Sequence, residues 1–452
     1  MKLLTIAGNA INTAVSVIVF SFLDLLDAFL CIIYKLVDFA VDWEWKPCYC
    51  SFSSSGNIVA TGCSSNGSNV LLLCASTNRL HLESISGTLH FRPYLLSEFA
   101  AFISQKYTGR HRRTPAILEI PSLKPKPRAA VPRWSDCDCR TCNQWSAGRE
   151  SESRSLYVRA EGNLAGTEED VVFIHGFISS SSFWTETVFG EFSEAARSRY
   201  RFLAVDLLGF GRSPKPEESL YTIREHLEMI ERSINQHGVR RRFHIVAHSL
   251  GSVLALALAA RHPDSVLSLT LLAPPYFPAR EGEEGELAVM RRVAPRKVWP
   301  PMAFAASMAC WYEHVSRTIC LLICRQHRLW DFIFRLLTLN RIRTFLIEGF
   351  MCHTHNAAWH TLHNVICGNS KKMDRYLAAL REQPGCHVNI FHGENDQLVP
   401  VDCSYAVQSR VPRANLKVIG GKDHITMVVG RQKNFAAELE KIWSDAKGNN
   451  VS

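Results

Sequence analysis

The sequence predicts an α/β protein: a mostly parallel sheet with helices on both faces and a helical lid. From about residue 155, strand-like runs alternate with helical runs, as in sheets whose parallel strands are joined by helices. One strand-like run, from Phe243, ends at Ser249 and passes directly into an alanine-rich helical stretch. The alternation breaks after Pro274. We expect residues 276–385 to form a lid inserted after the sixth strand, above the strand ends where ligands bind in such sheets.

An apolar segment, residues 1–45, comes first. Residues 3–23 carry no charge, and about 20 apolar residues can cross a bilayer. Four charges interrupt the apolar stretch that follows: Asp24, Asp27, Lys35 and Asp38. The alternatives are a cleaved signal peptide, an uncleaved signal anchor, an interfacial helix and an ordinary buried helix. We favour entry into the secretory pathway with an anchor, because no small-x-small cleavage site is evident.

Residues 46–154 form a spacer rich in Ser and Cys and then in Pro and Arg. The net charge of +9 is concentrated partly in its basic run, which is typical of a solvated linker and alternatively attracts anionic lipid. No nucleic-acid-binding motif accompanies it, so no nucleic-acid partner is expected. Asn66 begins a glycosylation sequon. Cys48 and Cys50 are candidates for acylation, and the cluster Cys137, Cys139 and Cys142 is expected to form disulfides, with zinc binding or free thiols as alternatives.

The predicted catalytic domain has two parts, residues 155–275 and 386–445, on either side of the lid. Seven strands are expected, at residues 155–160, 171–175, 201–206, 243–249, 266–273, 387–392 and 415–419. Helical stretches separate most of them, which predicts a parallel sheet covered by helices on both faces.

Ser249 has the sequence context of a nucleophile elbow, a sharp strand-to-helix turn that exposes a serine hydroxyl. Strand and helix pass close together there, so the residues two before and two after the serine must be small. These are Ala247 and Gly251. Ser249 is therefore the predicted covalent nucleophile.

A serine hydroxyl needs a histidine base, and the histidine needs an orienting carboxylate. For an elbow serine the chain order is serine, acid, histidine. Asp396, just after a late strand, is the predicted acid, and Glu394 is the alternative. His424, in the loop after the last strand, is the predicted base.

The oxyanion of the tetrahedral intermediate must meet backbone amides. We assign these to Leu250, which follows the nucleophile, and to Phe177, after the second strand. His175 and Gly176 support the Phe177 loop by letting it approach the site, while His248 is expected to be a packed neighbour rather than a second base. The predicted chemistry is two-step acyl transfer, in which water or another alcohol resolves the acyl-enzyme. It requires no metal and no organic cofactor.

Two groups of side chains in the predicted lid, histidines and aromatic residues, each allow two interpretations. His353, His355, His360 and His363 lack acidic neighbours, and we expect them to line a substrate entrance rather than bind metal. Aromatic residues of 301–351 are expected to pack between helices, with an acyl tunnel as the alternative: Trp311, Tyr312, Trp330, Phe332 and Phe334.

These motifs together resemble the α/β-hydrolase fold superfamily over about residues 155–445. The matching pieces are His175-Gly176-Phe177, Asp206-Leu-Leu-Gly209-Phe-Gly211-Arg-Ser213, Ala247-His-Ser-Leu-Gly251, Gly393-Glu-Asn-Asp396 and Asp423-His424. The serine at the elbow argues against the branches that use aspartate there.

The apolar leader, the Cys-rich spacer, the segment ending at Cys142 and the lid sequence His353–His360 resemble the plant BODYGUARD family of probable lysophospholipases. That resemblance implies a lipid or cutin-monomer ester as substrate, a role in cuticle formation, and a place at the membrane surface or cell wall. The alternative function is a ligand-binding or scaffolding protein with little turnover. The sequence leaves the oligomeric state open.

Overall fold

The chain folds into two compact units, one of Met1–Ser135 with Glu286–Ile319 and one of Asp136–Gly285 with Cys320–Ser452. The computed structural model describes residues 2–43, 70–71, 80–81, 85–89, 134–136, 155–163, 169–217, 219–239, 242–278, 285–337, 339 and 344–448. Asn66 and the clustered cysteines of the spacer, Cys48, Cys50, Cys137, Cys139 and Cys142, lie outside these residues.

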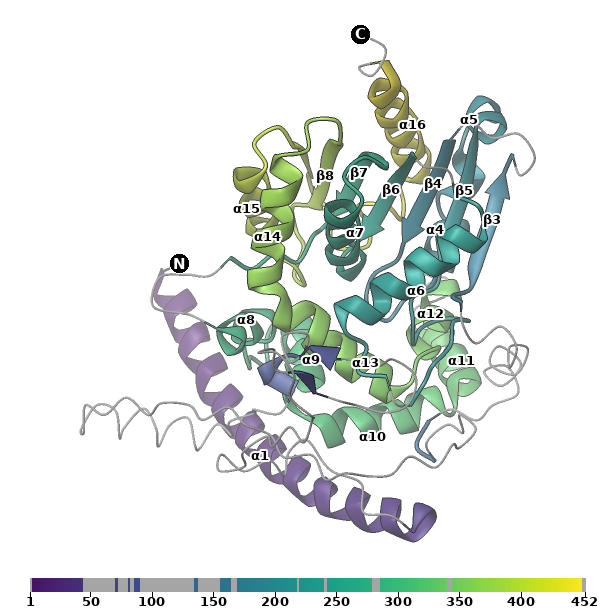
Figure 1. Cartoon of the computed structure of the whole chain (residues 1–452). Coiled ribbons are helices and arrows are strands. Elements are labelled where there is room, and N and C mark those ends of the chain that lie inside the picture. Colours follow the sequence, from purple (N-terminus) through teal and green to yellow (C-terminus); the bar gives the residue numbers. More distant parts are fainter. Residues whose placement is uncertain are drawn as a thin grey trace. The chain divides into compact units, whose positions relative to one another are not determined.

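The second unit is built on a seven-stranded sheet with the order β3-β5-β4-β6-β7-β8-β9 (Figure 1). Only β3 is antiparallel to its neighbour, and the other pairs are parallel. The strands are β3 (Val158–Gly162), β4 (Glu169–Ile174), β5 (Tyr200–Val205), β6 (Phe243–His248), β7 (Val266–Leu272), β8 (His387–Gly393) and β9 (Asn415–Ile419). All seven expected strands are confirmed, with ends that differ by a few residues.

Helices cover this sheet on both faces. The helices that lie wholly in this unit are α4 (Ser182–Thr185), η4 (Phe189–Glu191), α5 (Glu194–Arg199), α6 (Ile223–Gln236), α7 (Leu250–Arg261), α11 (His327–Leu337), α12 (Thr344–Met351), α13 (His355–Thr361), η5 (Leu362–Ile366), η6 (Cys367–Asn369), α14 (Ser370–Arg381), α15 (Asp402–Arg410) and α16 (Gln432–Gly448). On one face, Phe173 and Phe202 pack with Phe435 and Trp443 of α16 in an aromatic core. The alternating side chains point to the opposite face, where α7 packs.

The turn from β6 into α7 leaves no room for a side chain at Gly251. A Cβ atom there would lie 2.6 Å from the His175 carbonyl oxygen and 2.7 Å from that of Ile174. Leu250–Ala259 of α7 are all buried, as expected of a helix that is apolar on every side. The helix therefore lies directly against the strands that end at the elbow.

The helices expected to form the lid follow β7, which is the fifth strand of the sheet in chain order. The expected count of six was therefore one too high among the described residues, although the insertion does follow the strand that ends at Leu272. The lid is also not one compact unit. Residues 286–319 group with the N-terminal segment, whereas Cys320 and the residues after it group with the sheet.

The lid is divided because its first helices belong to the first unit, together with the N-terminal helix. The elements of this unit are α1 (Lys2–Asp42), β1 (Val70–Leu71), β2 (Leu80–His81), η3 (Gly87–Leu89), α8 (Glu286–Val293), α9 (Pro301–Trp311) and most of α10 (Glu313–Cys324). Here the charges that interrupt the apolar segment find partners. The Asp24 carboxylate accepts a hydrogen bond from the Tyr312 hydroxyl at 2.9 Å. Asp24 is thereby satisfied although it is buried.

Two further carboxylates of α1 bind α10. Asp27 accepts the backbone amides of His314 and Val315 at 2.8 and 3.1 Å, and so satisfies amides at the α10 N-terminus that have no partner within the helix. Asp38 forms a bidentate ion pair with Arg317, with N···O distances of 2.9 and 3.0 Å. Both partners of that pair are nearly buried.

The other face of α1 is apolar and exposed. Its exposed apolar side chains include Ile11, Val15, Ile18, Phe22, Leu25, Phe29, Ile32 and Leu36. Ala10–Val41 is long and apolar enough to cross a membrane, and a third of that segment is buried within the chain. The buried face of α1 thus mixes polar and apolar side chains, whereas its exposed face is apolar. An exposed apolar face of this length is not typical of an ordinary buried helix.

The Asp38–Arg317 pair allows a test of this packing. Arg317→Met leaves the Asp38 carboxylate buried without its cation, and removing one partner of a buried pair costs about 3–5 kcal/mol. We expect that loss in the free energy of unfolding, measured by chemical denaturation of the full chain. The control is Arg224→Met, which breaks an exposed pair with Glu228 and should cost at most about 1 kcal/mol. Equal costs for the two variants would contradict the packing of α1 on α10.

The crowding at Gly251 gives a second test. Gly251→Ala forces a methyl group against two backbone carbonyl oxygens, and overpacking of this kind costs about 1–3 kcal/mol. Gly190→Ala is the matched control, because a Cβ there meets nothing within 4 Å. We expect a lower melting temperature for the first variant only. An unchanged melting temperature for Gly251→Ala would show that the elbow is looser than described.

Candidate active site

Ser249 lies at the tight turn between β6 and α7 and has a strained backbone. Its φ is 52° and its ψ is −121°, a region that side-chain-bearing residues rarely adopt. Its amide donates to the Leu272 carbonyl at 2.7 Å, which ties the turn to the end of β7. Ala247, two residues earlier, is fully buried. These features are those of the expected nucleophile elbow.

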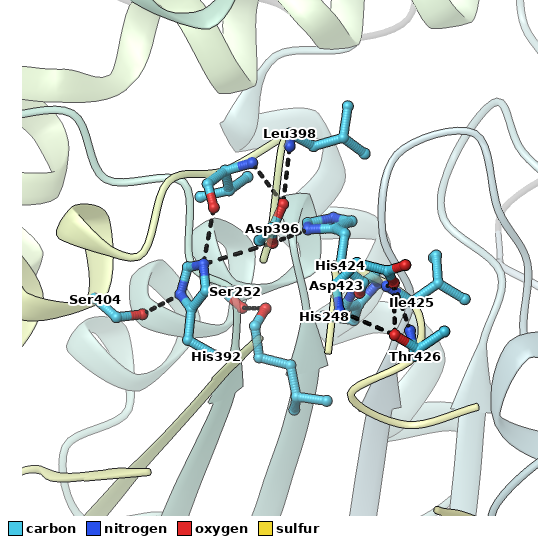
Figure 2. Close-up of polar contacts among 12 residues, drawn as sticks. His248, Ser252, His392, Asp396, Leu398, Ser404, Asp423, His424, Ile425 and Thr426 are labelled. Atoms are coloured by element: carbon cyan, nitrogen blue, oxygen red, sulfur yellow. Dashed lines mark hydrogen bonds and ion pairs between the residues drawn. The ribbon is translucent and has the colours of Figure 1, made fainter. Parts of the chain in front are cut away.

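His424 and Asp396 form a hydrogen-bonded pair. The Nδ1–H group of His424 donates to Oδ2 of Asp396 at 2.6 Å (Figure 2). The other carboxylate oxygen accepts the amides of Leu398 and Val399 at 2.8 and 2.9 Å. Asp396 follows β8 and His424 follows β9, so adjacent parallel strands bring the two residues to the same edge as Ser249.

The environment keeps Asp396 ionised. Burial raises the pKa of Asp396, but hydrogen bonds from His392, His424 and the Val399 amide outweigh burial and hold the pKa below its ordinary value. A depressed pKa in the folded state adds stability that is present above the unfolded pKa of about 3.9 and is lost as the pH falls below it. At pH values above about 4, Asp396 therefore remains a carboxylate that can orient an imidazole.

Glu394, the alternative acid, has a different partner. Its Oε2 atom accepts the Gly421 amide at 3.1 Å. Gly393 lies next to it, where an added Cβ would be 2.6 Å from the carbonyl oxygens of Lys422 and Asp423. The end of β8 thus packs against the loop that carries His424, and Glu394 braces that loop.

His248 holds the backbone of His424. Its Nε2–H group donates to the His424 carbonyl at 3.0 Å, and the two ring centroids are 4.7 Å apart. Burial and the neighbouring His424 lower the pKa of His248 to about 3. A neutral ring that already donates its proton to a carbonyl matches the expected packed neighbour. Because His248 precedes Ser249, the same contact places His424 beside the elbow.

Two residues of this network have no role assigned to them by the sequence analysis. His392 lies 3.5 Å from Oδ2 of Asp396 and also contacts Ser404 and the Val399 carbonyl. Asp423 accepts the amides of Ile425 and Thr426 and so shapes the turn around His424 (Figure 2). Asp423 directly precedes His424 and His392 is four residues before Asp396, and this closeness to predicted triad members is the signal in the sequence that could have found them.

The loop proposed for the oxyanion hole lies against the elbow. An added Cβ at Gly176 would be 2.9 Å from Nδ1 of His248 and 3.2 Å from Cβ of Ser249. His175 donates from Nδ1 to the Gly176 carbonyl at 2.7 Å and accepts the Leu207 amide at Nε2. The supporting roles of His175 and Gly176 thus have a structural basis, while the Phe177 and Leu250 amides remain predicted donors.

The lid residues divide between the two units. Trp311 and Tyr312 are buried in the first unit, where Arg296 lies 3.7 Å from the Trp311 ring. Phe332 of α11 is 64% exposed. The expected packing between helices is therefore observed for Trp311 and Tyr312 but not for Phe332. The four lid histidines, His353, His355, His360 and His363, belong to the second unit and are all buried.

Comparisons with known proteins agree with this architecture. Residues 171–430 match the α/β hydrolase fold family. The chain is 50% identical to "Probable lysophospholipase BODYGUARD 3" of Arabidopsis thaliana, with 97% of each chain covered. It is 48% identical to "Probable lysophospholipase BODYGUARD 1" of the same plant, over 96% of this chain and 97% of that one.

Among solved structures, a carboxylesterase of the archaeon Nitrososphaera gargenis aligns with a TM-score of 0.45 and 19% identity. The alignment covers 67% of this chain and 99% of the esterase. With the near-complete coverage of the plant relatives, the matched residues show that the chain belongs to the BODYGUARD family of α/β hydrolases.

Proposed function

We propose that this chain, an ester hydrolase of the lysophospholipase and esterase type, cleaves lipid esters with Ser249, His424 and Asp396 as its catalytic triad. The observation that carries the proposal is the 2.6 Å bond between His424 and Asp396 beside a serine with positive φ. The nucleophile, its base and the orienting acid follow one another in the chain order that an elbow serine requires.

In this mechanism Ser249 attacks the ester carbonyl while His424 takes the hydroxyl proton at Nε2. Asp396 holds the imidazole through Nδ1 and stabilises the cation that forms. The amides of Phe177 and Leu250 stabilise the oxyanion. The alcohol leaves with the proton from His424, and water then attacks the acyl-enzyme. A second alcohol in place of water would make the product an ester, so transacylation uses the same groups.

A lipid substrate is supported by two observations. The plant relatives are named probable lysophospholipases, and α1 carries an exposed apolar face suited to lipid. A cutin-monomer ester and a role in cuticle formation follow from the same family membership and belong to this proposal. A ligand-binding or scaffolding protein would keep the same triad and is the outcome if no ester turns over.

Labelling with a fluorophosphonate tests the triad, because this probe reacts with an activated serine. We expect wild-type labelling, none for Ser249→Ala, and normal labelling for Ser198→Ala, an exposed serine outside the site. Asp396→Asn should slow labelling and lysophospholipid hydrolysis by about 10⁴-fold. Glu394→Gln is its matched control and should retain nearly full rates.

Two results would contradict this account. Equal labelling of wild type and Ser249→Ala would show that Ser249 is not the nucleophile. A loss of rate in Glu394→Gln as large as that in Asp396→Asn would show that Asp396 is not the specific orienting acid. If wild type labels but hydrolyses no ester in a lipid panel, the binding function replaces the enzymatic one. Product analysis with a competing alcohol separates hydrolysis from transacylation.

For localisation, we propose that α1 is retained in the mature protein and places its apolar face in a membrane of the secretory pathway or cell surface. Three carboxylates of α1 hold Tyr312, the start of α10 and Arg317. Cleavage of α1 as a signal peptide would leave Arg317 without its carboxylate. An interfacial or anchoring helix is therefore favoured over a cleaved one.

Flotation of the full chain with phospholipid vesicles tests this placement. We expect wild type to float, and Ile18→Asn with Phe29→Asn to reduce flotation because each removes an exposed apolar side chain of α1. Tyr405→Asn, at a half-exposed residue of α15, is the control and should float like wild type. No difference in flotation between wild type and the Ile18→Asn, Phe29→Asn variant would overturn the lipid contact.

Two further measurements test the fate and topology of the N-terminal segment. Peptide mapping of the mature chain should recover residues 10–41, and glycosidase sensitivity at Asn66 would report lumenal exposure.

A further inference from the structure

A cluster of thiols and imidazoles lies in the second unit, apart from the triad. Ligand atoms of Cys320, Cys324 and His353 all lie within 4.8 Å of one another. The two cysteines are one turn apart at the end of α10, so they share a helix face. His353 comes from the segment between α12 and α13. The fold therefore joins ligands that are distant in sequence.

The side chains of this cluster lie at the spacing of metal ligands. Sγ of Cys320 is 3.6 Å from Nε2 of His353, and His355 follows His353 by two residues. Cys324, His353 and His355 are buried. Nε2 of His355 and Nδ1 of His353 have no hydrogen-bond partner among the described residues. A buried polar atom without a partner costs about 1–3 kcal/mol, which coordination of His355 would remove.

A disulfide between the two cysteines does not fit this backbone. Cβ atoms four residues apart on a helix are separated by about 5–6 Å, whereas a disulfide needs about 3.5–4.5 Å. Neither cysteine forms a disulfide, and α10 is helical through Cys324. Oxidation would therefore require the last turn of α10 to unwind.

We propose that Cys320, Cys324 and His353 bind a zinc ion, with His355 as the fourth ligand. Two thiolates and two imidazoles form a tetrahedral set typical of structural zinc sites. Calcium and magnesium are disfavoured because they require oxygen ligands, and no carboxylate belongs to this cluster among the described residues. Soft thiolates also accept copper(I), so metal analysis must distinguish the two ions.

The site lies close to the loop proposed for the oxyanion hole. His353 forms a β-bridge with Phe210, and the Phe210 ring packs edge-on against Phe177 at 6.0 Å. A metal at His353 would thus fix the end of α10 and this loop through one aromatic contact. The ion would be structural, and the acyl-transfer steps do not involve it.

This assignment differs from the expectation that the lid histidines line a substrate entrance. The sequence places Cys320 more than thirty residues before His353 and gives no sign that the two meet. The histidines alone lacked further ligands, and the cysteines of α10 supply them.

The test is metal analysis of the full chain, purified without chelators from zinc-supplemented cells. We expect one zinc ion per chain in wild type and in Cys310→Ser, which removes a buried thiol of α9 outside the cluster. Zinc should be absent from Cys320→Ser and Cys324→Ser and weakened in His355→Gln. Chelation should lower the melting temperature of wild type but not of Cys320→Ser.

A second measurement covers variants that fail to fold. Cobalt(II) added to metal-free wild type should produce thiolate-to-cobalt charge-transfer absorption, and zinc should protect Cys320 and Cys324 from alkylation in peptide mapping. Wild type without zinc, with copper instead, with a Cys320–Cys324 disulfide, or with alkylation unaffected by zinc would overturn the proposal. Equal zinc in wild type and Cys320→Ser would place the ion elsewhere.

Discussion

The backbone of Ser249 is held at a positive φ, and this single turn determines how the rest of the second unit must pack. Such a conformation costs on the order of 1–3 kcal/mol and persists only where surrounding structure enforces it. Three contacts enforce it. The Ser249 amide donates a hydrogen bond to the Leu272 carbonyl, Gly251 packs closely on the carbonyl oxygens of Ile174 and His175, and Gly176 packs against the serine itself. Small residues are therefore required on both chain segments that meet there.

The acid and base are arranged around the same turn. His248, the residue before Ser249, donates to the carbonyl of His424, so the elbow and the base loop are one hydrogen-bonded structure. His392 and two backbone amides hold Asp396 from the other side. In the first unit, hydrogen bonds likewise stabilise buried carboxylates. Asp24, Asp27 and Asp38 are tolerated in an apolar helix because each accepts a hydrogen bond.

The sequence was sufficient for features that depend on local pattern. Seven strands could be predicted from apolar runs, and so could the places of Ser249, Asp396 and His424 after strands, whose catalytic roles remain predictions. Features that depend on long-range contacts could not. The partnership of Asp38 with Arg317 spans most of the chain, and the meeting of Cys320 with His353 requires α10 and α12 to be placed first. No feature of the sequence around Asp38 shows that this carboxylate pairs with a distant arginine rather than simply interrupting an apolar segment.

The central claim is that the strained serine is the residue that forms the covalent intermediate. Peptide mapping of the wild-type full chain after reaction with a fluorophosphonate tests it most directly. The account predicts one adduct, on the peptide that contains Ser249, and none on Ser252, whose hydroxyl already donates to the Ala247 carbonyl. An adduct on any other serine, or no adduct at all under conditions where lipid esters are hydrolysed, would contradict it.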